Sequence, residues 1–132
     1  MSTILVNTLT GTTTAGSIAV TGETSSTTTN LQQGLAKYWI DFNGTGTVET
    51  RDSFNHSSLL DGGTGIYTIS YTNNFNNASY CAACGQEDNG GSIAVPRQGT
   101  DLATGSTVVR TTNGSSGSDT PYIHVALFGD LE

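Results

Sequence analysis

Positive charge is scarce in this sequence. Four basic residues stand against 11 acidic ones, which gives a formal net charge of −7. Nucleic-acid binding is driven by counterion release and needs clustered Lys and Arg, and anionic membrane surfaces draw on the same charges. The four basic residues are scattered along the chain: Lys37, Arg51, Arg97 and Arg110. We therefore expect no nucleic acid and no membrane as a partner.

Apolar side chains are also in short supply. The class AVILMFWYC makes up 34% of the chain, below the roughly 45–50% apolar content (Gly included) of ordinary globular proteins. No apolar run approaches the roughly 18 residues of a membrane span. Residues 1–7 have no basic region and too short an apolar stretch for a signal peptide, so we expect no export through the secretory route. The low apolar content also argues against a large enzyme with a deep core.

Small polar residues are what the chain has in abundance. Ser and Thr number 37, and 17 Gly and 10 Asn bring the total to 64 of the 132 residues. These residue types rank low on the helix scale and suit short strands joined by turns. The length leaves room for one folded domain. The composition therefore predicts an all-β domain and nearly excludes a helical bundle.

The first 36 residues differ from the rest of the chain. They contain no aromatic residue and include polar tracts at 10–16 and 22–29, so this segment cannot close a core of its own. Only contacts with another copy of the chain or with a larger partner can offset the entropy lost on ordering it. We predict an extended N-terminal attachment segment over 1–36 and a folded domain over 37–132. The expected attachment residues are the apolar ones of two short β-prone islands: Ile4, Leu5, Val6, Ile18 and Val20.

Residues 37–132 carry the signals of short strands joined by turns. Aromatic and β-branched residues alternate with polar ones, and turn signals recur about every 8–12 residues. No βαβ spacing occurs, so a parallel sheet is not expected. The pattern predicts an antiparallel β-sandwich of jelly-roll or immunoglobulin-like type. The expected strands are 37–42, 47–54, 66–71, 79–84, 92–95, 106–111 and 122–128.

The second of these strands carries two local predictions. Asn43-Gly44 is the dipeptide favoured for a two-residue hairpin turn, and it precedes the strand. A loop is expected after the strand, around His56. Alternation within the strand assigns one set of side chains to the inner face: Val48, Thr50, Asp52 and Phe54.

Cys81-Ala82-Ala83-Cys84 is the most visible candidate for chemistry, because a C-x-x-C pair can form a redox centre or half of a zinc site. A redox pair needs its first Cys at a helix N-terminus, and no helix signal follows Cys84. Residues three apart on a strand point to opposite faces, which prevents an internal disulfide. A zinc site would need two further ligands, and His56 and His124 each stand alone. We therefore expect both thiols to be buried structural groups.

No other pattern defines a catalytic, cofactor or metal site. A Ser/His/Asp constellation is formally available, but no Gly-x-Ser-x-Gly elbow accompanies it. The acidic residues are dispersed through turns, which does not suggest a glycosidase pair. The Gly-rich stretches lack the features of dinucleotide, Walker or calcium loops. Trp39 and the tyrosines could form a saccharide-stacking platform, although ten aromatics in a small sandwich are expected to serve core and interface packing.

Three motifs carry a resemblance to a known class of proteins. They are the aromatic strand and Gly-Thr-Gly turn of 34–47, the Arg-Asp-Ser-Phe-Asn of 51–55 and the Gly-Ile-Tyr-Thr-Ile of 65–69. With their spacing, they resemble a module of virion proteins of tailed phages, especially cyanophages and other aquatic phages. The pattern covers about residues 31–85 well and the remainder loosely. The opening segment is similar to the attachment segments of such proteins, and the Cys81/Cys84 pair lies outside the pattern.

The resemblance implies a β-rich fibre or decoration protein, commonly trimeric and without enzymatic activity. Its partners would be other copies of itself and the major capsid protein or the tail or connector proteins. Its place would be the virion, assembled in the host cytoplasm. Three functions stay open: a non-enzymatic virion component, a receptor- or glycan-binding module that uses loops 86–91 and 113–119 on a host surface, and a hydrolase.

Overall fold

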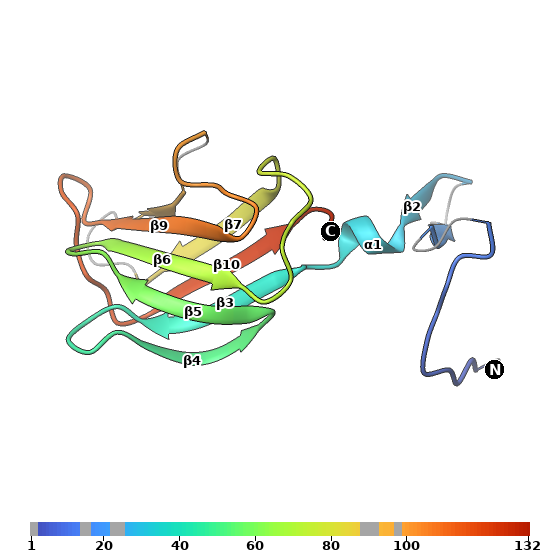
Figure 1. Ribbon diagram of the computed structural model, residues 1–132, viewed down its shortest axis with the longest axis horizontal. Helices are drawn as coiled ribbons and strands as arrows, with labels where there is room; N and C mark the ends of the chain where they lie inside the picture. Colours follow the sequence, from blue (N-terminus) through green and yellow to red (C-terminus); the bar gives the residue numbers. More distant parts are fainter. Residues whose placement is uncertain (1–2, 14–16, 22–25, 88–92, 97–98) are drawn as a thin grey trace. The chain divides into compact units, whose positions relative to one another are not determined.

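The computed structural model of the protein describes residues 3–13, 17–21, 26–87, 93–96 and 99–132 (Figure 1). The chain divides into two compact units, Met1–Leu35 and Ala36–Glu132. Within the described residues, the first unit holds two short strands and one helical turn. The second unit holds eight strands.

The first unit is a small hairpin followed by a helical turn. Strand β1 (Ala19–Thr21) pairs antiparallel with β2 (Thr28–Asn30), and α1 (Leu31–Gly34) follows at once. The N–H of Gln32 donates to Oδ1 of Asn30 at 2.8 Å, which caps the start of the turn. Of the two β-prone islands, the second forms most of β1, whereas residues 4–6 form no strand.

The second unit is the antiparallel β-sandwich that the sequence predicts. Its strands form two four-stranded sheets in the orders β4-β3-β10-β7 and β5-β6-β9-β8, which Figure 1 shows as two facing layers. Strand β8 lies at a sheet edge, as Pro96 indicates. The strands are β3 (Tyr38–Asn43), β4 (Glu49–Phe54), β5 (His56–Asp61), β6 (Ile66–Tyr71), β7 (Cys81–Gln86), β8 (Ile93–Val95), β9 (Ser106–Thr112) and β10 (Ile123–Phe128).

Strict alternation fills the space between the sheets. Every second residue of β3, β6 and β10 is buried, and the residues between them face outward, because successive side chains of a strand point to opposite faces. The buried apolar residues are Tyr38, Ile40, Phe42, Tyr67, Ile69, Tyr71, Phe75, Tyr80, Ala94, Val109, Ile123, Val125 and Leu127.

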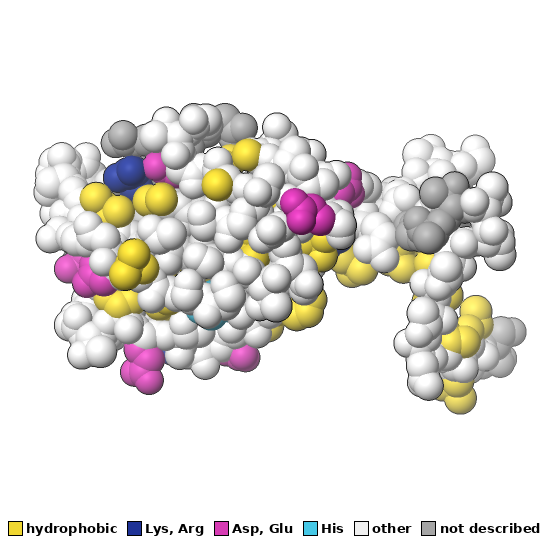
Figure 2. Space-filling model, viewed as in Figure 1, with side chains coloured by type: hydrophobic (Ala, Val, Ile, Leu, Met, Phe, Trp, Pro, Cys, Tyr) yellow, Lys and Arg dark blue, Asp and Glu magenta, His cyan; other side chains and the backbone are white. Residues whose placement is uncertain are grey.

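The outer surface reflects the Ser- and Thr-rich composition. Figure 2 shows few charged side chains on the face in view, with apolar side chains in small separate groups. Arg110 and Asp101 form a bidentate pair on the second unit, with nitrogen–oxygen distances of 2.9 and 3.0 Å. The Asp101 side chain is only 1% exposed, so the guanidinium neutralises a buried carboxylate.

The connection between β3 and β4 differs from the predicted two-residue turn. Asn43 is the last residue of β3, and residues 44–48 form the loop. The Asn43 amide organises this loop, since its Nδ2 donates to the carbonyl of Thr45 at 2.8 Å and its Oδ1 accepts from the Thr45 N–H at 3.2 Å. Gly44 is buried. A Cβ there would lie 2.5 Å from the Tyr67 hydroxyl oxygen, so the position requires glycine. In Asn43-Gly44, the asparagine side chain therefore caps the loop, and the glycine allows the backbone to lie close to Tyr67.

The predicted faces of the second strand are wrong at its far end. Asp41 pairs with Asp52 but Phe42 pairs with Thr50, so Arg51 is an extra residue that forms a β-bulge. The bulge shifts the alternation by one. Thr50 keeps an inward position opposite buried Phe42, whereas Asp52 and Phe54 are exposed on the outer face. Strict alternation would have buried the Asp52 carboxylate, and the bulge places it on the outer face instead.

The predicted loop around His56 is a strand instead. The chain turns from β4 in one sheet to β5 in the other through Asn55 alone, which has a φ of 60°. The Asn55 Nδ2 donates to the carbonyls of Lys37 and Asn73, each at 3.0 Å. Strand β5 escapes sequence detection because its residues show no regular alternation of apolar and polar side chains.

This corner places His56 against the core. Its Nδ1 lies 2.9 Å from the buried Tyr38 hydroxyl and its Nε2 lies 3.4 Å from Oγ1 of Thr50. Burial lowers the pKa of His56 from its ordinary value of 6.5, because removal from water penalises the imidazolium form. His56 is therefore a neutral structural hydrogen-bonding group at neutral pH.

A pH dependence of stability follows from this lowered pKa. The unfolded chain binds the His56 proton more tightly than the folded chain does, so stability falls as the pH drops below about 6.5 toward the lower folded pKa. Above that window the contribution is fully present. Urea unfolding at about pH 7.5 and about pH 5.5 should show this loss in the natural protein and a smaller one in His56→Gln. His124→Gln is the control, and an equal loss in both variants would contradict the assignment.

Candidate functional site

The outer face of the β4-β3-β10-β7 sheet gathers the exposed aromatic and ionisable side chains of the second unit. Strand register places Trp39 beside Phe54 on β4 and beside Ala126 on β10. One step along, Asp41 lies beside Asp52 and His124. Trp39 is 37% exposed and Phe54 is 52% exposed, so neither serves core packing, while the interface packing expected for aromatics stays a prediction.

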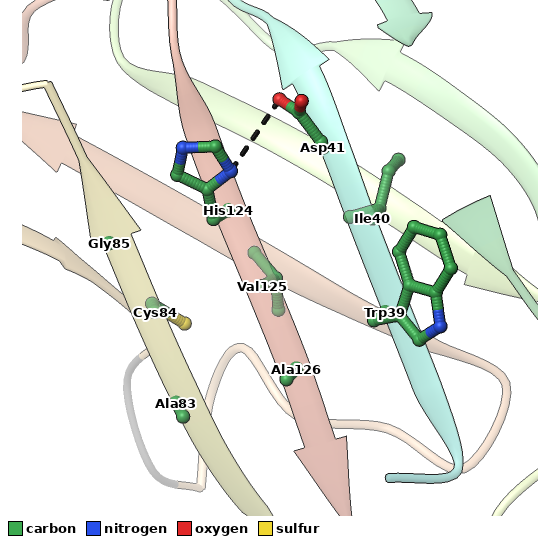
Figure 3. A pocket seen from close by; sticks show the side chains of 9 residues that line it. All are labelled: Trp39, Ile40, Asp41, Ala83, Cys84, Gly85, His124, Val125 and Ala126. Carbon is green, nitrogen blue, oxygen red and sulfur yellow. Dashed lines mark ion pairs between the residues drawn. The ribbon is translucent and has the colours of Figure 1, made fainter. Parts of the chain in front are cut away.

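Small residues leave a shallow hollow in the middle of this face. The outward positions of β7 and β10 next to Trp39 carry Ala83, Gly85 and Ala126, which add little bulk above the sheet. A hollow of about 370 Å³ results, bordered by Trp39, Asp41 and His124 (Figure 3). Outward positions of a sheet tolerate large polar side chains. The fold of the sheet therefore does not require small residues at these three positions, and the depression that they form is a separate feature of the surface.

A chain of polar contacts fixes the polar edge of the hollow. Oδ1 of Asp41 lies 3.1 Å from Nη1 of Arg51 and 3.6 Å from Nδ1 of His124, and Figure 3 shows Asp41 and His124 pointing toward each other. Arg51 Nη2 also donates to the carbonyl of Pro121 at 2.5 Å, and its guanidinium lies 4.3 Å from the centre of the Tyr122 ring. The bulged Arg51 is thus held from three sides, which orients the Asp41 carboxylate.

The two histidines that the sequence singled out lie in different parts of the second unit. His124 is on the outer face, whereas His56 packs against Tyr38 at the sheet corner. Both cysteines are free, and Cys81 is exposed, so the expectation that both thiols are buried is wrong for Cys81. Cys84 faces the core, and burial with the nearby Cys81 raises the pKa of its thiol to about 11. A raised pKa disfavours the reactive thiolate.

The five predicted attachment residues lie in the first unit. Ile4, Leu5 and Val6 precede the hairpin and are exposed, Val20 is an exposed residue of β1, and Ile18 is half-buried. The Ile18 carbonyl accepts from the N–H of Leu31 at 2.7 Å, which ties the start of the hairpin to the helical turn.

The loops predicted to contact a host surface are only partly within the described residues. Residues 88–91 lie outside them. In the second loop, Asn113 Oδ1 accepts from the N–H of Ser116 at 3.2 Å and from the Ser116 hydroxyl at 3.3 Å. This loop is closed by its own hydrogen bonds, whereas the sheet face offers a hollow that sequence reasoning missed.

The geometry limits the chemistry of these sites. Among the described residues, no group of three or more His, Cys, Asp or Glu side chains could hold a metal ion, and neither histidine has a hydrogen bond to a serine hydroxyl. No helix in that part of the chain is both long and apolar enough to cross a membrane. Comparisons with protein-family models, curated proteins and solved structures found no match for the chain.

Proposed function

We propose that the chain is a non-enzymatic structural protein of a phage virion, a cement or decoration protein or a short fibre, attached to the particle through residues 1–36. One observation carries the proposal: none of the described residues of the first unit is buried. The unit instead exposes large apolar side chains, with Leu5 at 90% and Ile4 at 79%. The others are Val6, Leu9, Val20 and Leu35.

Attachment would offset a cost that the first unit cannot meet itself. Ordering the backbone of one residue costs about 1–2 kcal/mol in conformational entropy. Burying one Ile or Leu side chain against a partner contributes about 1.5–3 kcal/mol of stabilisation. The second unit has its own apolar core, so its folding does not require the first. Exposed apolar side chains on a segment that contributes nothing to the core of the second unit are suited to binding another protein.

The hairpin offers a second means of attachment. Among the described residues, neither β1 nor β2 pairs with a third strand, so each presents backbone N–H and C=O groups at its outer edge. A strand of a partner protein can add to such an edge through backbone hydrogen bonds. This mode suits a polar segment, because it makes little demand on the Thr and Ser side chains around it.

The resemblance of residues 31–85 to phage virion modules points to the class of partner. The partners proposed are other copies of the chain in a homotrimer, and the major capsid protein or the tail or connector proteins. The place of the protein is then the virion, with assembly in the host cytoplasm. The second unit would project from the particle as a compact domain.

Disrupting the apolar segment should abolish attachment while the second unit stays folded. Leu5→Asp combined with Ile4→Asp places two charges where apolar contact is expected, and deletion of 1–30 removes all five predicted attachment residues. We expect both variants to fail to co-sediment with particles assembled without the protein, because burying an unpaired carboxylate costs several kcal/mol. Sedimentation of the free protein measures the expected trimer.

The control for charge alone is Leu60→Asp. Leu60 is 62% exposed but lies on β5 of the second unit, so this variant should bind particles as the natural protein does. Retained co-sedimentation of the deletion variant would refute attachment through residues 1–36. A monomer at every concentration, with or without particles, would refute the trimer.

A further inference from the structure

We propose that the hollow on the outer face of the β4-β3-β10-β7 sheet binds a neutral saccharide, with one sugar ring against Trp39 and its hydroxyls on Asp41 and His124. The site goes beyond attachment to a particle, because it lies on the second unit and uses none of the residues of the first. It also differs in place from the loops that the sequence suggested.

The apolar part of the site suits the C–H face of a sugar ring. Trp39 and Phe54 are cross-strand neighbours, so both present apolar surface on the outer face. Both remain substantially exposed. Aromatic rings combine large contact area with little conformational entropy loss, so they bind a rigid ring at low cost.

The hollow gives this aromatic surface a neighbouring cavity of suitable size. Its floor is formed by Ala83, Gly85 and Ala126, and its volume is about 370 Å³. Ligand sites are typically concave and apolar with a few well-placed polar groups.

The polar groups match sugar hydroxyls, which both donate and accept hydrogen bonds. Asp41 Oδ1 is already engaged by Arg51 and lies near His124 Nδ1. Asp41 Oδ2, His124 Nε2 and the Trp39 indole N–H have no hydrogen-bond partner within the described parts of the chain. One acceptor, Oδ2 of Asp41, and one ring nitrogen of His124 that donates or accepts according to its tautomer therefore border the hollow.

Charge selects against other ligand classes. The chain carries a net charge of −7, and Asp41 lies beside Asp52 on the same face, so anionic sugars and phosphates are repelled. The Arg51 contact to Asp41 offsets one of these carboxylates, which weakens the attraction for a cation. A neutral saccharide is the ligand that meets both the apolar and the polar parts of the site.

The single tryptophan of the chain reports directly on this site. Tryptophan emission is titrated with the methyl α- and β-glycosides of glucose, galactose, mannose and N-acetylglucosamine. We expect a saturable change with at least one of them at millimolar concentration, because a shallow site supplies only about −4 kcal/mol. No saturable change with any of these probes would overturn the proposal.

Two variants separate the hollow from the rest of the surface. Ala126→Leu fills the hollow from the outer face of β10 without touching the core, and it should weaken binding at least about tenfold. Asp41→Asn keeps the shape and removes the charge, and it should weaken binding severalfold. Leu60→Ala, on the other sheet, should leave the affinity unchanged. Equal affinity of Ala126→Leu and the natural protein would overturn the site.

Two further results would assign the face to another occupant. A saturable response to choline chloride but to none of the glycosides would indicate a cation bound over the ring. Emission that changes with protein concentration in the absence of any probe would indicate that a second copy of the chain covers Trp39. Either result would overturn the saccharide site.

Discussion

Alanine at position 65 is expected to remove more than about 4 kcal/mol of folding stability. Gly65 has a φ of 66°, which costs any residue with a Cβ about 1–2 kcal/mol. A Cβ there would also collide with the carbonyl oxygen of Thr111 and lie 2.7 Å from the Ser118 nitrogen. These atoms cannot move aside, because the Thr111 N–H donates to the Gly65 carbonyl at 2.9 Å and the Ser118 N–H donates to the Thr111 carbonyl at 3.1 Å.

The junction around Gly65 also holds one end of the sandwich together. The Gly65 N–H donates to Oδ1 of Asp119 at 2.7 Å, and the buried Tyr67 hydroxyl donates to the same oxygen at 2.9 Å. Tyr67 reaches the Gly44 carbonyl as well, at 2.9 Å. A displaced Gly65 would therefore disturb the loops before β4, β6 and β10 together.

Gly46→Ala is the matched control for this substitution. Gly46 has nearly the same φ, 64°, but a Cβ there meets no atom within 4 Å. This variant should lose only about 1–2 kcal/mol, from the backbone conformation alone. Urea unfolding followed by tryptophan emission measures both. Equal losses in the two variants would show that the close approach at Gly65 contributes nothing.

The sequence predicts the strands whose apolar residues alternate, because that alternation is a local property of the chain. Strands β6 and β10 lie where the pattern places them, and every second residue of each is buried. Strand β5 was missed because its sequence, His-Ser-Ser-Leu-Leu-Asp, has no such alternation. Its pairing with β6 comes from the corner at Asn55 and from backbone hydrogen bonds that any sequence can make.

The candidate site was beyond sequence reasoning for a different reason. Trp39, Ala83 and Ala126 are far apart in the chain and meet only through the register of β3, β10 and β7. Register between distant strands is set by the whole core, so no local pattern shows that these residues share a face. The bulge at Arg51 adds to the difficulty, because it turns Phe54 from the core to the outer face.

Phe75→Ala is expected to lower the folding stability by about 3–5 kcal/mol and Tm by about 10 °C or more. Phe75 lies in the connection between β6 and β7, outside any strand, yet it is 1% exposed. Its ring stacks on Tyr80 with centroids 4.3 Å apart and meets the edge of Tyr71 at 5.2 Å. Removing the ring would leave a cavity that rigid neighbours cannot fill.

The neighbours of Phe75 are rigid because hydrogen bonds fix them. The Tyr80 hydroxyl lies 2.9 Å from that of Tyr71 and 2.5 Å from that of Thr107, and it also reaches the Ala103 carbonyl at 2.9 Å. Collapse into the cavity would break this buried network, whose unpaired hydroxyls would each cost about 1–3 kcal/mol. The cavity is therefore expected to persist.

Phe54→Ala applies the same change to a ring that is 52% exposed on the outer face. It should cost less than about 1 kcal/mol, because it opens no cavity and uncovers little apolar surface. Because both variants replace Phe with Ala, any difference between their thermal unfolding temperatures reports the contribution of core packing at Phe75. If Phe75→Ala were no more destabilising than Phe54→Ala, the connection between β6 and β7 could not be part of the core. The contacts between Tyr71 and Tyr80 would then be stable without the Phe75 ring.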